Sequence, residues 1–112
     1  MILNQEGRLI SPPSWVDFLH TDWERRVRLD VPGTQRDLDK WGLVPVEGLR
    51  LVLYQEDATK QGSIDDLVTV GNVFFDGGEQ RWVAIIDWEA LRHVSELSLP
   101  EAAVYREYRP QS

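Results

Sequence analysis

The most regular alternation of hydrophobic and polar residues lies between Leu49 and Trp88. Leucine occupies every second position from 49 to 53, a pattern that predicts a strand with one face in the core. Residues 67–76 are apolar in both registers, as in a central strand that is covered on both sides. Gly71 interrupts this run and predicts a bulge or a sharp bend. The chain is therefore expected to be organised around a sheet formed by its central part.

A hairpin is predicted directly after the central strand. Residues 76–79 read Asp-Gly-Gly-Glu, and these residue types suit a tight turn. From 81 to 88 the alternation resumes, and it places Trp82, Ala84, Ile86 and Trp88 on one face. We expect segments 67–76 and 81–88 to pair as antiparallel strands, with those four side chains in the core.

Shorter elements are predicted on both sides of this block. Before it, the pattern indicates a strand at 5–10, a helical turn that starts at Ser14, a strand at 26–31 and a helix from Thr34 to a left-handed cap at Gly42. After it, a helical turn at 88–91 leads to a short strand at 92–94. Ser98 and Glu101 form a capping box that predicts a closing helix at 99–108.

These elements predict one small, mainly β domain. Five or six short strands with one or two capping helices suggest a strongly bent antiparallel sheet or a partly closed, SH3-like barrel. The alternative is an α+β arrangement with helices laid across one sheet face. A chain of 112 residues has room for a single domain, 1–112, and its last residues, 109–112, are expected to form a frayed tail.

Charge and composition exclude several classes of function. The net charge of −7 disfavours binding to nucleic acid or to an anionic membrane surface, and it points to a basic partner or simply to solubility, of which solubility is the commoner cause. The chain has no cysteine, which removes disulfides, thiolate metal sites and a cysteine nucleophile. No apolar run is long enough to span a bilayer, and no signal pattern precedes the domain, so the expected location is the cytoplasm.

The polar segment 56–66 resembles a calcium-binding loop in its spacing. Asp57, Thr59, Gln61 and Asp65 stand at positions where such a loop places its oxygen ligands. Val68, however, occupies the position of the bidentate glutamate, and the flanking segments are predicted strands, so an EF-hand is rejected. A weakly bound divalent cation is the one cofactor that the sequence suggests. The alternative, a solvated hairpin loop, is favoured because Asp and Gly dominate turns.

No catalytic residues are predicted. His93 lies near Asp87 and Ser95 in the sequence, but nothing like a nucleophile elbow surrounds Ser95. His20 and His93 lack the spacing of paired metal ligands. We therefore interpret His93 as a hydrogen-bonded structural residue, and we do not expect an enzyme.

Aromatic residues are the best candidates for a binding surface. The chain has five tryptophans, and an exposed aromatic cluster is a typical hot spot of protein interfaces. Trp23, Trp41 and Tyr54 each lie beside charged residues rather than inside an apolar run. These three are the predicted partner-binding residues.

Three functional hypotheses follow from the sequence. The first is a non-catalytic binding module, in a specific version an immunity-type acidic inhibitor that neutralises a basic protein. The second is an enzyme with a carboxylate site around Asp57, Asp65 and Asp66 in the 56–66 loop, with or without a divalent cation. The third is a structural subunit that forms a homo-oligomer. Segments 65–68 and 82–88 have the look of a small bacterial protein, and they point to no particular activity.

Overall fold

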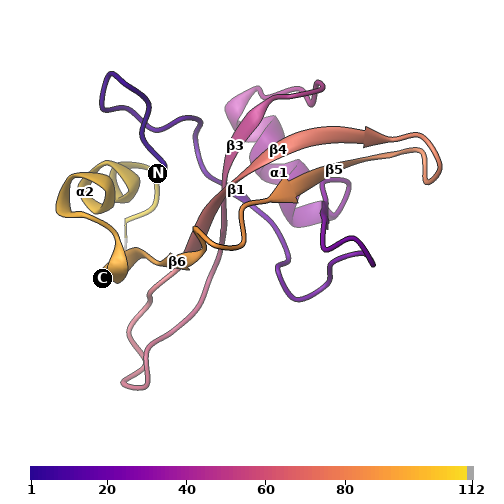
Figure 1. Cartoon of the computed structure of the whole chain (residues 1–112). Helices are drawn as coiled ribbons and strands as arrows, with labels where there is room; N and C mark the ends of the chain where they lie inside the picture. Colours follow the sequence, from indigo (N-terminus) through magenta and orange to yellow (C-terminus); the bar gives the residue numbers. More distant parts are fainter. Residues whose placement is uncertain (111–112) are drawn as a thin grey trace.

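The computed structural model describes residues 1–110 and has a curled sheet at its centre (Figure 1). The elements, in chain order, are β1 (Ser14–Trp15), β2 (Val27–Arg28), α1 (Pro32–Trp41), β3 (Arg50–Gln55), β4 (Leu67–Asp76), β5 (Arg81–Ile86), β6 (Arg92–His93), the 3₁₀ turn η1 (Val94–Glu96) and α2 (Leu99–Tyr108). Neither helix within residues 1–110 is long and apolar enough to cross a membrane.

Strand β4 is the centre of the sheet. The strand order is β1-β3-β4-β5-β2, and the short β6 pairs with the beginning of β4. The first half of β4 pairs with β3 and its second half pairs with β5, so the sheet curls along this one long strand (Figure 1). The predicted small, strongly bent sheet with two short helices is confirmed. The sheet is mixed rather than wholly antiparallel, because β1 runs parallel to β3.

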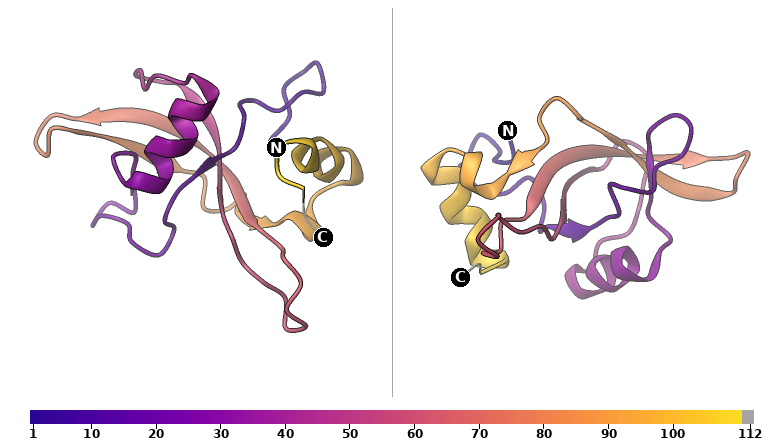
Figure 2. Two further views of the ribbon diagram at one scale, coloured as in Figure 1. Left: turned by 180° about the vertical axis from the view of Figure 1, so that it is seen from behind. Right: turned by 90° about the horizontal axis from the view of Figure 1, so that it is seen from below.

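Two hydrophobic cores lie on opposite faces of the sheet. One core contains Val52 and Tyr54 of β3 and is covered by α2 and the amino-terminal segment. The other contains Leu51 and Leu53 of β3 and is covered in part by Leu38 of α1. The prediction that only one face of this strand enters the core was wrong, because α1 covers one face of the sheet and α2 covers the other (Figure 2).

Gly71 is required by close packing rather than by a bulge. The pairing of β4 continues without a register shift on both sides of this residue, which pairs with Leu51 and Ile86. A Cβ atom at position 71 would come within 2.8 Å of Leu53 Cδ1 and 3.1 Å of the carbonyl oxygen of Ile85. A larger residue would have to displace the Leu53 side chain and would press against the backbone of Ile85, so glycine fits the packing at this position.

Helix α1 begins two residues earlier than the sequence predicted. Pro32 occupies the first turn, where its fixed φ suits a helix and its missing N–H group is not needed. The helix ends at Gly42, which has a φ of 67° and forms the predicted left-handed cap. Thr34 and Asp37 therefore do not form a capping box. Thr34 is buried within the first turn, and Asp37 points toward β1 and β3.

The carboxyl-terminal elements match their prediction. Asp87 caps the turn that follows β5, since one of its carboxylate oxygens accepts a hydrogen bond from the amide of Ala90. Ser98 and Glu101 form the expected capping box of α2. Ala84 and Ile86 are buried, and Trp82 and Trp88 are half-buried against the same core. Local sequence patterns were sufficient here because each signal is contained within a few residues.

The amino-terminal predictions were wrong in three places. Residues 5–10 form a turn and not a strand, because Gly7 adopts a φ of 78° and the Asn4 side chain accepts hydrogen bonds from two amides of the turn. The segment at Ser14 is strand β1 and not a helical turn. The predicted strand 26–31 is reduced to Val27–Arg28, because only these two residues pair with β5.

Candidate binding site at the Trp23 turn

The turn that carries Trp23 is shaped by the aspartate at its start. The amides of Glu24 and Arg26 both donate to Asp22 Oδ1 at 2.9 Å. The backbone closes the turn on itself, since the amide of Asp22 donates to the carbonyl of Arg26 at 2.9 Å and the amide of Arg25 donates to the carbonyl of Asp22 at 2.9 Å. An aspartate that accepts hydrogen bonds from following amides is a standard way to stabilise a turn. Residues 22–26, here called the Trp23 turn, therefore have a defined shape.

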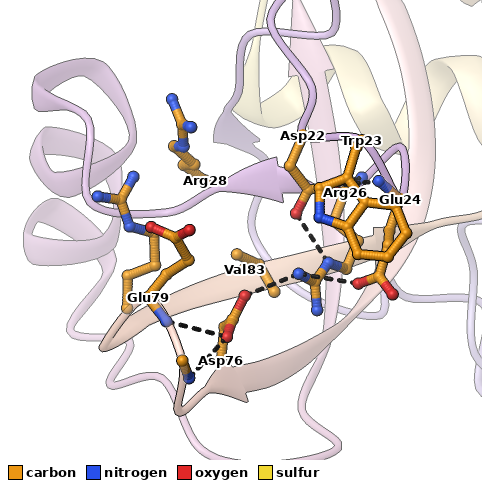
Figure 3. Close-up of a pocket in the computed structure, with 10 residues that line it drawn as sticks. Asp22, Trp23, Glu24, Arg26, Arg28, Asp76, Glu79 and Val83 are labelled. Atoms are coloured by element: carbon orange, nitrogen blue, oxygen red, sulfur yellow. Dashed lines mark hydrogen bonds and ion pairs between the residues drawn. The ribbon is translucent and has the colours of Figure 1, made fainter.

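Arg26 ties the Trp23 turn to the β4–β5 hairpin. Its Nε donates to Asp22 Oδ2 at 2.8 Å, and its Nη2 lies 2.8 Å from Asp76 Oδ2 and 3.0 Å from Glu24 Oε2 (Figure 3). The Arg26 side chain is only 12% exposed, so these ion pairs are partly shielded from water. A planar guanidinium that holds three carboxylates fixes the position of the turn relative to the sheet.

Two of the carboxylates around Arg26, those of Asp22 and Asp76, are held in their charged form. Burial alone would raise the pKa of Asp22, but hydrogen bonds from the Arg26 backbone and guanidinium outweigh it, and the pKa is lowered. The amide of Glu79, and after it the Arg26 guanidinium, keeps the pKa of Asp76 below its ordinary value. These two carboxylates therefore remain ionised at neutral pH.

A second anchor holds the Trp23 turn from its other side. The indole Nε1 of Trp88 donates to the carbonyl oxygen of Arg25 at 3.0 Å. The guanidinium of Arg25 lies 4.8 Å from the centre of the Trp88 ring, and Phe18 packs against the same ring edge to face. Contacts from two directions therefore hold the backbone of the turn, and Trp23 at its tip projects into solvent.

Trp23 itself is left in solvent. Its side chain is 87% exposed, the highest value among the large hydrophobic residues of the described chain. It borders a hollow of about 500 Å³ that lies between the Trp23 turn and the β4–β5 hairpin (Figure 3). Four carboxylates and three arginines line the hollow, namely Asp22, Glu24, Asp76, Glu79, Arg26, Arg28 and Arg81. An exposed tryptophan beside a charged hollow is the arrangement of an interface hot spot with its polar rim.

The neighbouring sheet surface adds apolar area to this site. Phe74 of β4 is 39% exposed, and its ring lies 5.9 Å from the Arg26 guanidinium. Its cross-strand partner in β5 is Val83, which lines the hollow. The surface around Trp23 therefore combines aromatic and charged groups, while Val83, which is 1% exposed, closes the hollow from beneath without adding much surface.

The structure separates the three aromatic residues that the sequence suggested as one binding surface. Trp23 stands alone at its turn. Trp41 and Tyr54 line a different hollow, near the ends of the two helices. Tyr54 is only 3% exposed, and its hydroxyl donates to Asp37 at 3.0 Å. Of the three, Trp23 is the one that is exposed enough to dominate a protein interface.

Three of the four predicted cation ligands of the 56–66 loop, Asp57, Thr59 and Asp65, form hydrogen bonds within the protein. Asp57 Oδ2 lies 2.8 Å from His93 Nε2, and Asp65 accepts hydrogen bonds from the amide and the hydroxyl of Ser95. Thr59 accepts a hydrogen bond from the amide of Ser63, and Gln61 is exposed. Within residues 1–110, no three His, Asp or Glu side chains are grouped in a way that could hold a metal ion.

His93 joins two segments and is not part of a triad. Its two ring nitrogens contact Asp57 and Glu96, whereas the Ser95 hydroxyl donates to Asp65. The hydrogen bond to Asp57 raises the pKa of His93. The interpretation of His93 as a hydrogen-bonded structural residue agrees with this geometry.

Comparison with known proteins gives no indication of function. No protein-family model, curated protein or solved structure matches this chain significantly. The function must therefore be argued from the site itself.

Sequence reasoning missed the residues that hold the site together. Arg26 forms ion pairs with carboxylates of its own turn and with Asp76, which lies 50 residues further along the chain. The spacing of Asp22 and Arg26, four residues apart, and the turn preference of aspartate were the only available signals. The contribution of the hairpin could not be read from the sequence.

Proposed function

We propose that this domain is a non-catalytic, cytoplasmic binding module that recognises a basic protein through the Trp23 turn and the adjoining hollow. The observation that carries the proposal is a tryptophan that is 87% exposed on a turn held by hydrogen bonds and ion pairs. A rigid aromatic side chain loses little conformational entropy on binding, so its burial contributes efficiently to affinity.

Charge supports a basic partner. The whole chain carries a net charge of −7, and carboxylates outnumber arginines around the hollow. Opposite charge on a partner would accelerate association and orient the two surfaces. An immunity-type inhibitor that neutralises a basic protein is a specific form of the same proposal.

The test compares two alanine variants of the tagged protein, one at a tryptophan and one at a leucine. Trp23→Ala removes the proposed hot spot, and Leu99→Ala is the matched control because Leu99 is 85% exposed and lies on α2. We expect Trp23→Ala to lose a basic protein that the wild type and Leu99→Ala retain from a native extract. Calorimetry with that purified partner should show a loss of affinity of about tenfold to several hundredfold.

Two results would argue against the proposal. If Trp23→Ala and Leu99→Ala bind the purified partner equally well, the Trp23 turn is not the binding surface. If the retained protein is acidic, or if salt leaves its association rate unchanged, electrostatic recognition of a basic protein is wrong.

A further inference from the structure

A second hollow, of about 410 Å³, lies between the carboxyl-terminal ends of α1 and α2. It is lined by Arg36, Lys40 and Trp41 of α1, by Tyr54 of β3, and by Tyr108 and Arg109 at the end of α2. It shares no lining residue with the hollow beside Trp23. Its volume is in the range of small-molecule sites.

The charge of this helix-end hollow is opposite to that of the whole chain. Three of the twelve basic side chains of the protein line it, against one carboxylate, Asp37. Asp37 is already fully engaged. Its Oδ2 accepts hydrogen bonds from the amide of Trp15 at 2.8 Å and from the Tyr54 hydroxyl at 3.0 Å, and its Oδ1 lies 3.4 Å from Arg36 Nε. Burial raises the pKa of Tyr54, so the hydroxyl stays protonated as a donor.

Lys40 is the cation that is available to a ligand. Arg109 is partly engaged, because its guanidinium pairs with the buried carboxylate of Asp66 at 3.2 Å while it stacks 4.2 Å from the centre of the Tyr54 ring. The Lys40 ammonium, by contrast, makes no ion pair with any residue in 1–110, and it lies 4.6 Å from the centre of the Trp41 ring. Arg36 and Arg109 are each paired with one carboxylate, so Lys40, which has no carboxylate partner within the described residues, leaves the hollow with a local positive potential.

The aromatic wall of the hollow is held in place. Trp41 Nε1 donates to the carbonyl of Pro13 at 3.0 Å, and the Trp41 and Tyr108 rings pack edge to face with centres 5.7 Å apart. Both indole and phenol present flat apolar surface beside the cations. Such a wall suits a planar group, and the cations suit an oxyanion.

We propose that the helix-end hollow binds a small ligand that joins an oxyanion head group, carboxylate or phosphate, to a flat apolar body. In this arrangement Lys40 contacts the head group, and Trp41 and Tyr108 contact the body. The guanidinium of Arg109, held by its ion pair with Asp66, lines the same hollow.

The test uses NMR titration with inorganic phosphate, phenyl phosphate and benzoate, and it follows the indole N–H signals of the five tryptophans. We expect phenyl phosphate or benzoate to shift the Trp41 signal saturably at millimolar or lower concentration, and to leave the Trp23 signal unchanged. Comparison of these two probes distinguishes a phosphate from a carboxylate ligand. If inorganic phosphate alone binds as tightly as phenyl phosphate, the proposed contact with a flat body is wrong.

Matched lysine variants make the test specific. Lys40→Glu should weaken binding by about tenfold or more, because a charge-assisted contact is replaced by repulsion. Lys60→Glu changes the net charge by the same amount on the exposed 56–66 loop, and it should leave the affinity unchanged. The indole signals of Trp15, Trp23, Trp82 and Trp88 should be unshifted in both unliganded variants, which serves as a check of folding; Trp41 is left out of this check because Lys40 lies against its ring. Absence of a saturable Trp41 shift with all three probes, or an equal loss for Lys60→Glu, would overturn the proposal.

Discussion

At the scale of single residues, the buried carboxylate of Asp66 depends on partners within the protein. Asp66 is fully buried, and it accepts a hydrogen bond from the Tyr105 hydroxyl at 2.7 Å besides its ion pair with Arg109. Arg109 opens the segment predicted to fray; its side chain is engaged here, and residues 111–112 lie outside the described part of the chain. A buried charge is tolerated only when such partners are present.

Tyr105→Phe removes one of these partners and preserves the ring. We expect the free energy of unfolding to fall by about 1–3 kcal/mol, because Asp66 loses a short hydrogen bond and no water can replace it in the core. Urea denaturation followed by circular dichroism would measure the change. Tyr108→Phe is the control, since Tyr108 is 38% exposed and its hydroxyl makes no hydrogen bond within residues 1–110. Equal effects of the two substitutions would contradict this account.

At the scale of elements, side chains complete the edges of the sheet. Ser11 Oγ accepts a hydrogen bond from the amide of Val52 in β3 at 2.8 Å. The Glu47 carboxylate accepts a hydrogen bond from the amide of Phe75 in β4 at 2.9 Å. These contacts satisfy amides that would otherwise offer a template for another strand. His93 has a similar connecting role, because it joins the 56–66 loop to η1 through Asp57 and Glu96.

The His93 connection makes stability depend on pH. The pKa of His93 is raised above 6.5, first through the hydrogen bond to Asp57, so the folded state favours the protonated ring. The stabilisation is therefore complete below about pH 6.5 and is lost as the pH rises through the higher pKa of the folded state. The lowered pKa values of Asp57 and Glu96 affect only the acidic range, below their ordinary values.

We expect His93→Gln to flatten the decline in unfolding free energy that the wild type shows above about pH 6.5. Urea denaturation at a series of pH values would test this. His20→Gln is the control, because the His20 side chain is 80% exposed. If His20→Gln flattens the profile as much as His93→Gln does, the Asp57–His93–Glu96 contact does not cause the pH dependence.

At the scale of the whole molecule, the two cores depend on the same two strands. Side chains of β3 and β4 alternate between the core under α2 and the core under α1, so neither core can form without the sheet. This arrangement predicts a single cooperative unfolding transition.

Leu38→Ala tests this coupling between the cores. Leu38 is 2% exposed in the core under α1, and its truncation should lower the free energy of unfolding by about 2–5 kcal/mol. Trp82 and Trp88 pack against that core and Trp15 packs against the other, so tryptophan fluorescence reports on side-chain packing in both cores, whereas far-ultraviolet circular dichroism reports on the helices and strands. Both signals should shift to the same lower urea midpoint. Separate midpoints would show that the cores unfold independently, and the exposed Leu99→Ala should leave both signals within about 0.5 kcal/mol of the wild type.

Local patterns were enough to predict the β4–β5 hairpin, both helices and the small bent sheet. Alternation along 67–76 and 81–86, the cap at Gly42 and the capping box at Ser98 act over a few residues, so their physical causes are visible in a short stretch of sequence. Trp23 was likewise recognised as a candidate because its immediate neighbours are charged.

Tertiary structure alone decided the remaining features, because they depend on residues that are distant in the sequence. Strand β1 forms because the edge of β3 is free to pair with it and because Asp37 of α1 accepts a hydrogen bond from the amide of Trp15. Arg26 reaches Asp76 because the pairing of β2 with β5 places the Trp23 turn beside the β4–β5 hairpin. The free energy of such contacts depends on distance in space, which a linear pattern of residue types does not contain.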